Sequence, residues 1–141
     1  MFRTSILVRF CDLDPAGIAY YPNLVNFLHE AFEDFFAGHV GRSFPEVFRD
    51  GLGFPTARVE MVYLSPVRYG DRVEISVGVE HIGRTSVRFR YRGAVEGRPV
   101  FDALNTGVVV DMSDFRPRPI PDWIRRRLEA AAVRPEPLSR A

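Results

Sequence analysis

The sequence predicts an α+β domain in which an antiparallel sheet wraps around one long central helix. One segment in the first third, residues 22–37, carries apolar side chains at helical spacing over a wide face. Most of the remaining chain alternates apolar and polar residues, as strands do, and the connections are short, which favours antiparallel neighbours. The 141 residues suffice for one such domain with a substantial core.

The first strand is expected over residues 2–10, where apolar side chains alternate with polar ones. Pro22 suits the first position of the long helix, because it needs no amide hydrogen there and its φ is preset. Tyr21 would then be the N-cap, and Gly38 is expected to end the helix. The apolar face is too wide for a helix that touches only one small sheet, so we expect other structure to enclose it.

A loop or short helix is expected at 43–52, and four strands should follow it. These strands are centred on segments with period-two patterning: 59–63, 72–80, 86–92 and 104–112. Turns are expected at 69–71, 83–84 and 96–97. A final helix should run from Trp123 to about Ala132 with Asp122 as its N-cap. We expect a single domain over 1–133 and a flexible tail over 134–141.

A strand, a long enclosed helix, four strands and a short helix make the arrangement called the hotdog fold. Its single curved sheet has open edges, which usually pair with another copy. The sequence therefore predicts a homo-oligomer, either a dimer or a tetramer.

Composition excludes several classes of function. The net charge of +1 argues against a protein that coats nucleic acid or an anionic membrane. All 19 basic residues are Arg, so no lysine can act as a Schiff base or general base. The N-terminal apolar run is too short for a signal peptide, and no stretch has the roughly 18 apolar residues of a membrane span. With one cysteine, Cys11, and hence no intramolecular disulfide, we expect a cytoplasmic protein.

Residues 12–23 read DLDPAGIAYYPN and connect the first strand to the long helix. This stretch closely resembles the signature loop of the 4-hydroxybenzoyl-CoA thioesterase family, whose members have the hotdog fold. The resemblance covers about residues 3–125, but only the loop is specific. It implies an acyl-CoA thioesterase without metal or organic cofactor, with Asp14 as the catalytic carboxylate and Gly17 among the substrate-binding residues.

Two further positions bear on the acyl group. Tyr21 stands where a branch resembling the Tol-Pal-associated thioesterases has a histidine, and this favours the aromatic-acyl branch. The aryl-CoA enzyme has an acid on the long helix for the substrate's 4-hydroxyl group, and His29 occupies that place here. The resemblance thus implies hydrolysis of a small acyl-CoA without fixing the acyl group. His29 either lines the acyl pocket or is a core histidine.

Thioester hydrolysis needs a carboxylate that attacks the carbonyl carbon or activates water, and a donor for the oxyanion. A helix N-terminus supplies such a donor, because its first N–H groups lack intrahelical acceptors and the helix dipole favours negative charge. Asp14 lies just ahead of the helix, so the backbone N–H of Tyr21 could polarise the thioester carbonyl. The alternative is an Asx turn before Pro15, for which Asp12 is an equal candidate.

The resemblance also implies where coenzyme A binds. Arg84 and Thr85 stand where the family carries a basic residue and a hydroxyl for its phosphates, and Arg116 matches a second basic position. Guanidinium groups suit phosphate oxygens because they pair with them bidentately. The neighbouring strand arginines, by contrast, are expected on a solvated sheet face: Arg88, Arg90 and Arg92.

Other reactive residues carry less weight. Cys11 follows an apolar strand with no histidine nearby in sequence, so we expect a buried structural thiol. The three histidines show no metal-ligand spacing. A hotdog dehydratase needs a histidine base on the active-site loop, and residues 11–23 contain none. A non-catalytic acyl-CoA sensor and a thioesterase for carrier-protein thioesters remain the alternatives.

Overall fold

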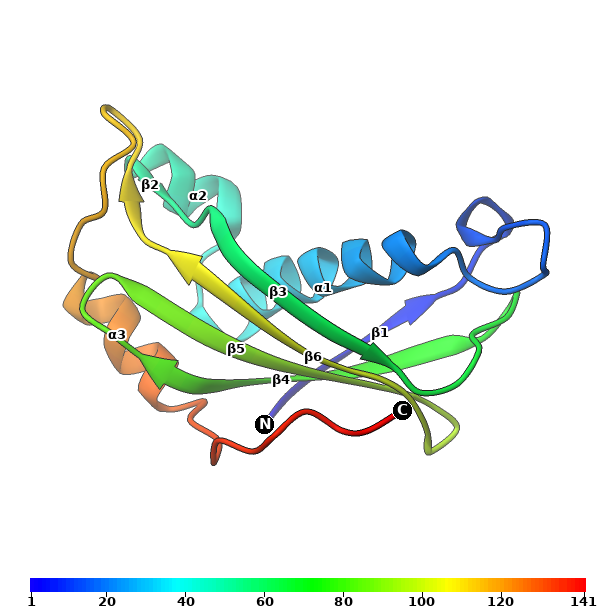
Figure 1. Cartoon of the computed structure of the whole chain (residues 1–141). Helices are drawn as coiled ribbons and strands as arrows, with labels where there is room; N and C mark the ends of the chain where they lie inside the picture. Colours follow the sequence, from blue (N-terminus) through cyan, green and yellow to red (C-terminus); the bar gives the residue numbers. More distant parts are fainter.

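The computed structural model describes residues 1–141 and confirms an α+β domain with one long helix (Figure 1). Five strands form an antiparallel sheet in the order β1-β4-β5-β6-β3, so β1 and β3 are its edges. The bounds of the main elements are β1 Phe2–Leu7, α1 Tyr21–Phe35, β3 Thr56–Tyr63, β4 Arg72–Ile82, β5 Ser86–Val95, β6 Arg98–Val108 and α3 Asp122–Glu129.

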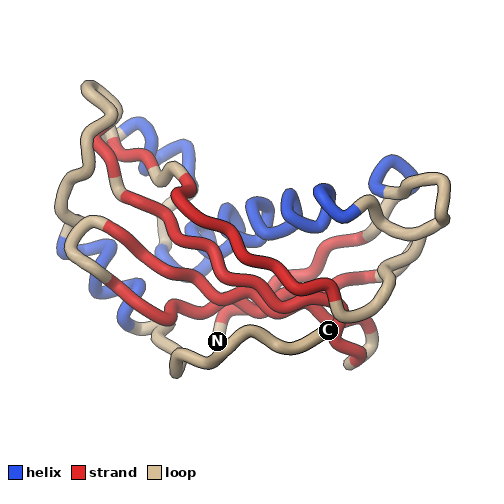
Figure 2. The backbone as a smooth tube through the Cα atoms, in the orientation of Figure 1, coloured by secondary structure: helices blue, strands red, loops and turns tan.

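Helix α1 lies along the concave face of the curved sheet (Figure 2). Its buried side chains pack against the inward-facing residues of β4 and β5, and together they form one hydrophobic core. The helical contribution to this core is Leu24, Phe27, Leu28, Ala31, Phe32 and Phe35. The wide apolar face in the sequence therefore reflects an enclosed helix, as predicted.

The predicted start of the long helix is wrong by one residue and its predicted end by three. Tyr20 is the N-cap, and its carbonyl accepts the N–H of Asn23, so Tyr21 is already helical. At the other end the chain continues through the π-helix η2, Phe36–Val40, and stops at Gly41, whose φ is 89°. Gly38 is needed for another reason: a Cβ there would lie 2.8 Å from the ring of Phe2 on β1.

Short elements complete the domain. The expected segment after α1 contains the helix α2, Phe44–Arg49, which starts with a capping box at Ser43. Strands β2, Leu52–Gly53, and β7, Val110–Asp111, pair in a small separate sheet. The predicted N-cap of α3, Asp122, is its first helical residue, because the carbonyl of Pro121 accepts the N–H of Arg125. No helix is both long and apolar enough to cross a membrane.

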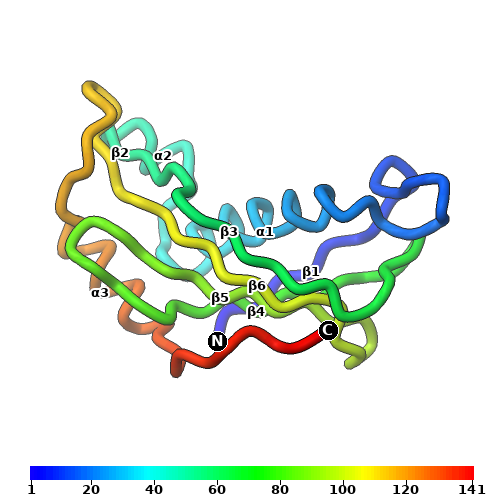
Figure 3. The backbone as a smooth tube through the Cα atoms, in the orientation of Figure 1, coloured from blue at the N-terminus to red at the C-terminus, as the bar shows by residue number.

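The C-terminal segment, residues 134–141, runs in an extended conformation along the outer face of the sheet (Figure 3). The sequence indicated a flexible tail, but here the segment is hydrogen bonded to the sheet. Ser139 donates to the Asp102 carboxylate from both its backbone N–H, at 2.9 Å, and its hydroxyl, at 2.8 Å. Sequence periodicity gives no sign of these contacts, because they join residues far apart in the chain.

This segment also corrects the expectation of a fully solvated row of arginines. Arg90 is only 4 % exposed, because the segment covers it and Asp102 pairs with it. Arg88 and Arg92 are exposed, as expected. The chain approaches the sheet closely just before this segment: a Cβ on Gly78 would lie 2.6 Å from Val133.

Candidate active site

The loop between β1 and α1 holds Asp14 in a tight turn. The Asp14 N–H donates to Ile18, and the Gly17 N–H donates to the Asp14 carbonyl, both at 3.0 Å. Gly17 has a φ of 78°, a conformation that favours glycine. One Asp14 carboxylate oxygen accepts the N–H of Ala16 at 2.8 Å, so the predicted Asx turn is present. The other oxygen accepts no hydrogen bond from the chain and can act as a nucleophile or a general base.

Asp12 has a different role in the same loop. Its carboxylate accepts the backbone N–H of Arg9 at 2.8 Å and so caps the short helix η1, Phe10–Asp12. Its carbonyl accepts the N–H of Tyr20 at 2.8 Å and the side-chain amide of Asn23 at 2.9 Å. Asp12 therefore fastens the loop to the start of α1.

The backbone N–H of Tyr21 is free at the helix N-terminus. As the first helical residue Tyr21 has no acceptor within α1, and no turn, loop or cap hydrogen bond of the chain uses its N–H. Tyr63 at the end of β3 donates its hydroxyl to the Tyr21 carbonyl at 3.0 Å. This bond fixes the first helical turn against the edge of the sheet.

Three tyrosine rings surround this helix start. Tyr21 makes edge contacts with the rings of Tyr20 and Tyr63, with centroids 5.3 and 6.0 Å apart. Burial, followed by the proximity of Tyr21, raises the pKa of Tyr63 above its usual value of 10.0. The Tyr63 hydroxyl therefore keeps its proton at neutral pH and can act as the donor.

An apolar cavity of about 480 Å³ lies between α1 and the strands β3, β5 and β6. Of its 17 lining residues 11 are hydrophobic, and aromatic rings dominate: Phe32, Phe44, Phe48, Phe54, Phe89, Tyr91 and Phe115. Cavities of this size and character hold small organic ligands. Val25, one turn after Tyr21, belongs to the lining, so the cavity comes within about 6 Å along the helix axis of the free N–H.

Besides Tyr91 with its phenol, three polar side chains share the cavity wall: His29 of α1, Thr56 of β3 and Asn105 of β6. Of the two alternatives left open by the sequence, the structure places His29 at the cavity rather than in the core. Its side chain is 59 % exposed and lies 3.9 Å from Glu33. Asn105 donates to the Thr56 hydroxyl at 3.2 Å.

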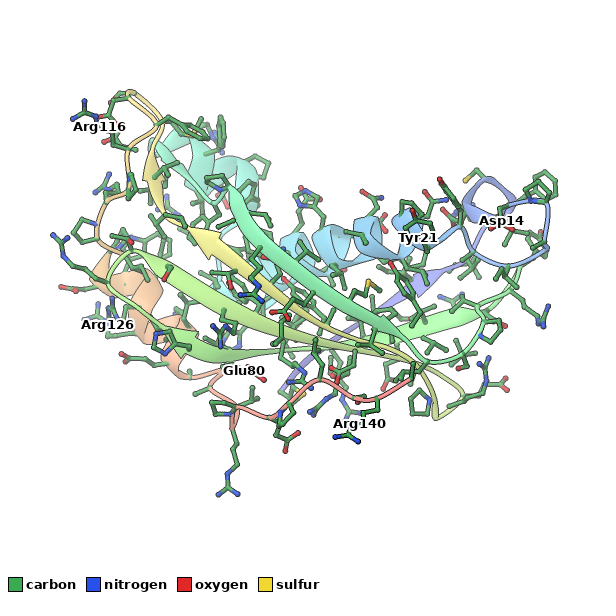
Figure 4. All side chains as sticks on the ribbon, in the orientation of Figure 1. Asp14, Tyr21, Glu80, Arg116, Arg126 and Arg140 are labelled. Carbon is green, nitrogen blue, oxygen red and sulfur yellow. The ribbon has the colours of Figure 1, made fainter.

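The residues expected to bind coenzyme A lie at the other end of the molecule from Asp14. Arg84 and Thr85 form the β4–β5 turn, and Arg116 follows β7; neither arginine has an ion-pair partner. The two loops are tied together, because Ile120 donates to the Arg84 carbonyl at 3.0 Å and Val109 to the Thr85 carbonyl at 2.7 Å. Figure 4 shows Arg116 at the opposite end from Asp14 and Tyr21.

In a single chain Asp14 and Gly17 lie in the loop that leads into α1 and Tyr21 is the first residue of that helix, whereas Arg84, Thr85 and Arg116 lie on two hydrogen-bonded loops elsewhere. The cavity extends between these groups, since Val25 is one turn from Tyr21 and Phe115 is next to Arg116.

Phe115 has a φ of 59°, an unusual conformation for an aromatic residue.

Sequence reasoning missed or misplaced three features here. Cys11 is exposed rather than buried, because β1 ends at Leu7 and η1 turns the chain outward. Tyr63 gave no signal beyond its place in an alternating strand. The polar Asn105 interrupts an apolar strand pattern, and that interruption is the signal that could have identified it.

The comparisons with known proteins identify the family and the fold. The family model described as the thioesterase-like superfamily matches residues 8–128. The chain is similar to a 1,4-dihydroxy-2-naphthoyl-CoA hydrolase of Synechococcus elongatus, with 29% identity over 133 residues that cover 93% of this chain and 97% of the relative.

Two solved structures have the same fold. A thioesterase superfamily protein from Jannaschia sp. superposes with a TM-score of 0.88 at 27% identity, covering 94% of this chain and 93% of its own. A gentisyl-coenzyme A thioesterase superposes with a TM-score of 0.83 at 24% identity, covering 90% and 99%. With a family match over most of its length and the fold of these enzymes, the chain belongs to the thioesterase-like superfamily.

Proposed function

We propose that the protein hydrolyses an aromatic acyl-CoA to the free acid and coenzyme A. The observation that carries this proposal is the aromatic cavity that starts one helical turn from the free N–H of Tyr21. The curated relatives, named as hydrolases of 1,4-dihydroxy-2-naphthoyl-CoA, support an aromatic acyl group.

In the proposed reaction the acyl ring occupies the cavity and the thioester carbonyl oxygen accepts the Tyr21 N–H. Negative charge grows on that oxygen as the carbonyl carbon becomes tetrahedral, and the N–H together with the helix dipole stabilises it. One such donor contributes about 3 kcal/mol to catalysis in well-studied hydrolases. In one route the free Asp14 oxygen attacks the carbonyl carbon, the coenzyme A thiolate leaves, and water then hydrolyses the acyl-Asp14 anhydride to the free acid. In the other route Asp14 takes a proton from the attacking water, the C–S bond breaks, and the leaving thiolate receives that proton.

The phosphates of coenzyme A would bind to Arg84, Thr85 and Arg116. Gly17 would contact the substrate near the loop. Both guanidinium groups are exposed and unpaired, so a phosphate would not have to displace an existing partner. Their distance from Asp14 in one chain is explained if the two groups of residues meet across a subunit interface.

A homo-oligomer, dimer or tetramer, is therefore part of the proposal. Edge strand β3 leaves one side of its eight residues without a partner strand, and an unpaired edge of this length favours pairing with another copy. Its residues Thr56–Val59 are all exposed. We also place the protein in the cytoplasm, because its one thiol has no disulfide partner.

A hydrolysis assay with purified protein tests the activity. Benzoyl-, 2-naphthoyl-, phenylacetyl-, acetyl- and palmitoyl-CoA are compared by the loss of thioester absorbance, because the exposed Cys11 would react with a thiol reagent. We expect the aromatic substrates to have the highest kcat/KM. Binding of the acyl-CoAs without turnover would indicate a non-catalytic acyl-CoA sensor. Turnover of carrier-protein thioesters but of no acyl-CoA would indicate a thioesterase for carrier-protein substrates.

Analytical ultracentrifugation tests the assembly. We expect a dimer or tetramer at micromolar concentration. At substrate concentrations well below KM, mixing Asp14→Asn with Arg84→Ala chains should give more activity than the two variants give separately, since one interface would then combine two intact groups. A monomer with full activity would contradict a shared site.

A further inference from the structure

Asn105 is a polar residue in the wall of an otherwise largely aromatic cavity. It lies on β6 with its side chain on the inner face of the sheet, between Phe89 on β5 and Val59 on β3 in the strand pairing. Both neighbours also line the cavity. An apolar residue would be the ordinary choice at such a position, because the inner face of the sheet forms the core.

The Asn105 amide has free hydrogen-bonding capacity. A side-chain amide has two N–H donors and a carbonyl acceptor. One donor is used, by the Thr56 hydroxyl at 3.2 Å, and no other group of the chain bonds to the amide. The second N–H and the carbonyl oxygen are therefore available to a molecule in the cavity. Asn105 is half-buried, so water can reach these groups in the free protein. A bound ring that displaces this water without replacing its hydrogen bonds would lose about 1–3 kcal/mol, so a ligand that bonds to both groups gains affinity.

The free groups match a particular chemistry. A phenolic hydroxyl donates one hydrogen and accepts through its lone pairs, which complements one free acceptor and one free donor on the amide. An anionic substituent would fit poorly, because no arginine lines the cavity and the amide carbonyl would repel it.

From these contacts we infer that Asn105, held by Thr56, binds a ring hydroxyl of the acyl group and makes the enzyme selective for hydroxylated aromatic acyl-CoAs. This inference rests on the proposed function, because it places the acyl ring in the same cavity. Selectivity arises because a ring without the hydroxyl displaces water from the amide and leaves it unpaired.

The test compares matched substrates, such as 1-hydroxy-2-naphthoyl-CoA with 2-naphthoyl-CoA, and the corresponding hydroxybenzoyl isomers with benzoyl-CoA. We expect the parent protein to prefer the best hydroxylated isomer by about tenfold or more in kcat/KM, the effect of one well-made hydrogen bond in a ligand site. Asn105→Leu keeps the size of the side chain and removes its polar atoms. It should bring this ratio close to one, mainly through the hydroxylated substrate.

Asn26→Leu is the matched control, since Asn26 is an exposed residue of α1 outside the cavity lining. It should leave the ratio unchanged. Thr56→Val should lower the ratio less than Asn105→Leu does, because the Asn105 amide remains and loses only the hydrogen bond to Thr56 that holds its orientation. This variant also covers the case in which Asn105→Leu does not fold, which circular dichroism would reveal.

A binding measurement separates this inference from the proposed function. Titration calorimetry with free hydroxynaphthoate and naphthoate needs no turnover, and Asn105→Leu should lose the preference for the hydroxylated acid. If the parent hydrolyses aromatic thioesters but Asn105→Leu or Thr56→Val leaves the substrate ratio and acid preference intact, the inference is wrong and the proposed function stands. If aromatic acids bind with the expected preference but no aromatic thioester is hydrolysed, the proposed activity is wrong instead.

Discussion

The two faces of the sheet differ in how fully their polar side chains are hydrogen bonded: Arg90 and Asp102 are buried on the outer face, and Asn105 is half-buried on the inner face. On the outer face Arg90 is 4 % exposed and Asp102 is 1 % exposed, and both are fully engaged. On the inner face Asn105 uses one of its hydrogen-bonding groups and leaves the others open to the cavity. Polar groups with complete partners stabilise a fold, whereas polar groups with free capacity in a cavity are available to a ligand.

Every N–H of the Arg90 side chain on the outer face has a hydrogen-bond acceptor. The Arg90 guanidinium donates to both Asp102 oxygens at 2.6 and 2.5 Å and to Glu80 at 2.7 Å. The backbone carbonyls of Glu136 and Pro137 accept at 2.7 and 3.1 Å. All five N–H donors of the guanidinium are thereby used, and none remains for a substrate.

We therefore expect changes on the outer face to reduce stability and changes on the helix side to reduce activity. The largest change in free energy is expected on the outer face, at Asp102.

Asp102→Asn should lower the free energy of unfolding by about 3 kcal/mol or more, because the variant leaves the buried Arg90 charge without its main partner. The melting temperature should fall by about 10 °C for a chain of this size. Chemical denaturation measures the first quantity and calorimetry the second. The kcat of folded protein at 25 °C should stay within about twofold of the parent, since Asp102 lies on the opposite face from the cavity.

The same variant makes a pH-dependent prediction. Burial would raise the pKa of Asp102, but hydrogen bonds from Arg90 and Ser139 outweigh it and hold the pKa below the ordinary 3.8. A lowered pKa means that the stabilisation is present above about pH 4 and is lost as the pH falls through the folded-state pKa. The difference in stability between parent and Asp102→Asn should therefore shrink in acid. A difference that stays constant down to pH 2 would contradict the role of the carboxylate charge.

On the helix side, Asp14→Asn should lower kcat by at least about a hundredfold, as expected for loss of a catalytic carboxylate, and leave the melting temperature nearly unchanged. Steady-state kinetics with an aromatic acyl-CoA and a thermal melt measure both effects. Asp12→Asn is the control and should affect kcat much less, because the Asp12 carboxylate caps η1. A kcat within about threefold of the parent would remove Asp14 from the mechanism.

The sequence was sufficient for the fold because its signals are local. The period-two strands, the glycine turns and the wide apolar helix face each depend on neighbouring residues, and the structure has them, although the strand predicted over 104–112 divides between β6 and β7. Helix ends were less accurate, since Gly38 avoids a clash with Phe2 and does not end the helix. That contact joins segments far apart in the chain, and no local pattern encodes it.

Only the part of the site that lies in one continuous stretch of sequence could be predicted. The loop of Asp14 and the start of α1 are contiguous, so a motif identifies them. The bond from Tyr63 to Tyr21, the pair Asn105–Thr56 and the docking of Ser139 on Asp102 connect distant positions. Such pairs become visible only when the strand register is known.

At the phosphate end, Arg84→Ala should raise KM by about five- to thirtyfold with little change in kcat, because a phosphate contact is similar in ground and transition states. With a truncated pantetheine thioester, which lacks the nucleotide phosphates, the variant should match the parent. Arg88→Ala is the control, since Arg88 is an exposed arginine on β5. Equal damage with both substrates would mean that Arg84 supports the fold or an interface.

The smallest effect is expected at Tyr63, which touches the site through Tyr21. Tyr63→Phe keeps the ring that packs on Tyr21 and removes the hydroxyl that donates to the Tyr21 carbonyl at 3.0 Å. A hydrogen bond of this kind contributes about 1 kcal/mol, so we expect kcat to fall about three- to fivefold through a less fixed N–H.

Substrate length and pH distinguish positioning from a general structural role. Because Tyr63 acts at the thioester end, full-length and pantetheine substrates should lose the same factor in kcat, in contrast to Arg84→Ala, and KM should not change. The raised pKa of Tyr63 keeps its hydroxyl protonated, so the factor should be constant from about pH 6 to pH 9. Tyr69→Phe, at an exposed tyrosine of a loop, is the control. If Tyr63→Phe lowers the melting temperature and leaves kcat intact, the hydroxyl stabilises the fold, as the contacts of Arg90 and Asp102 do, and does not position the free N–H of Tyr21.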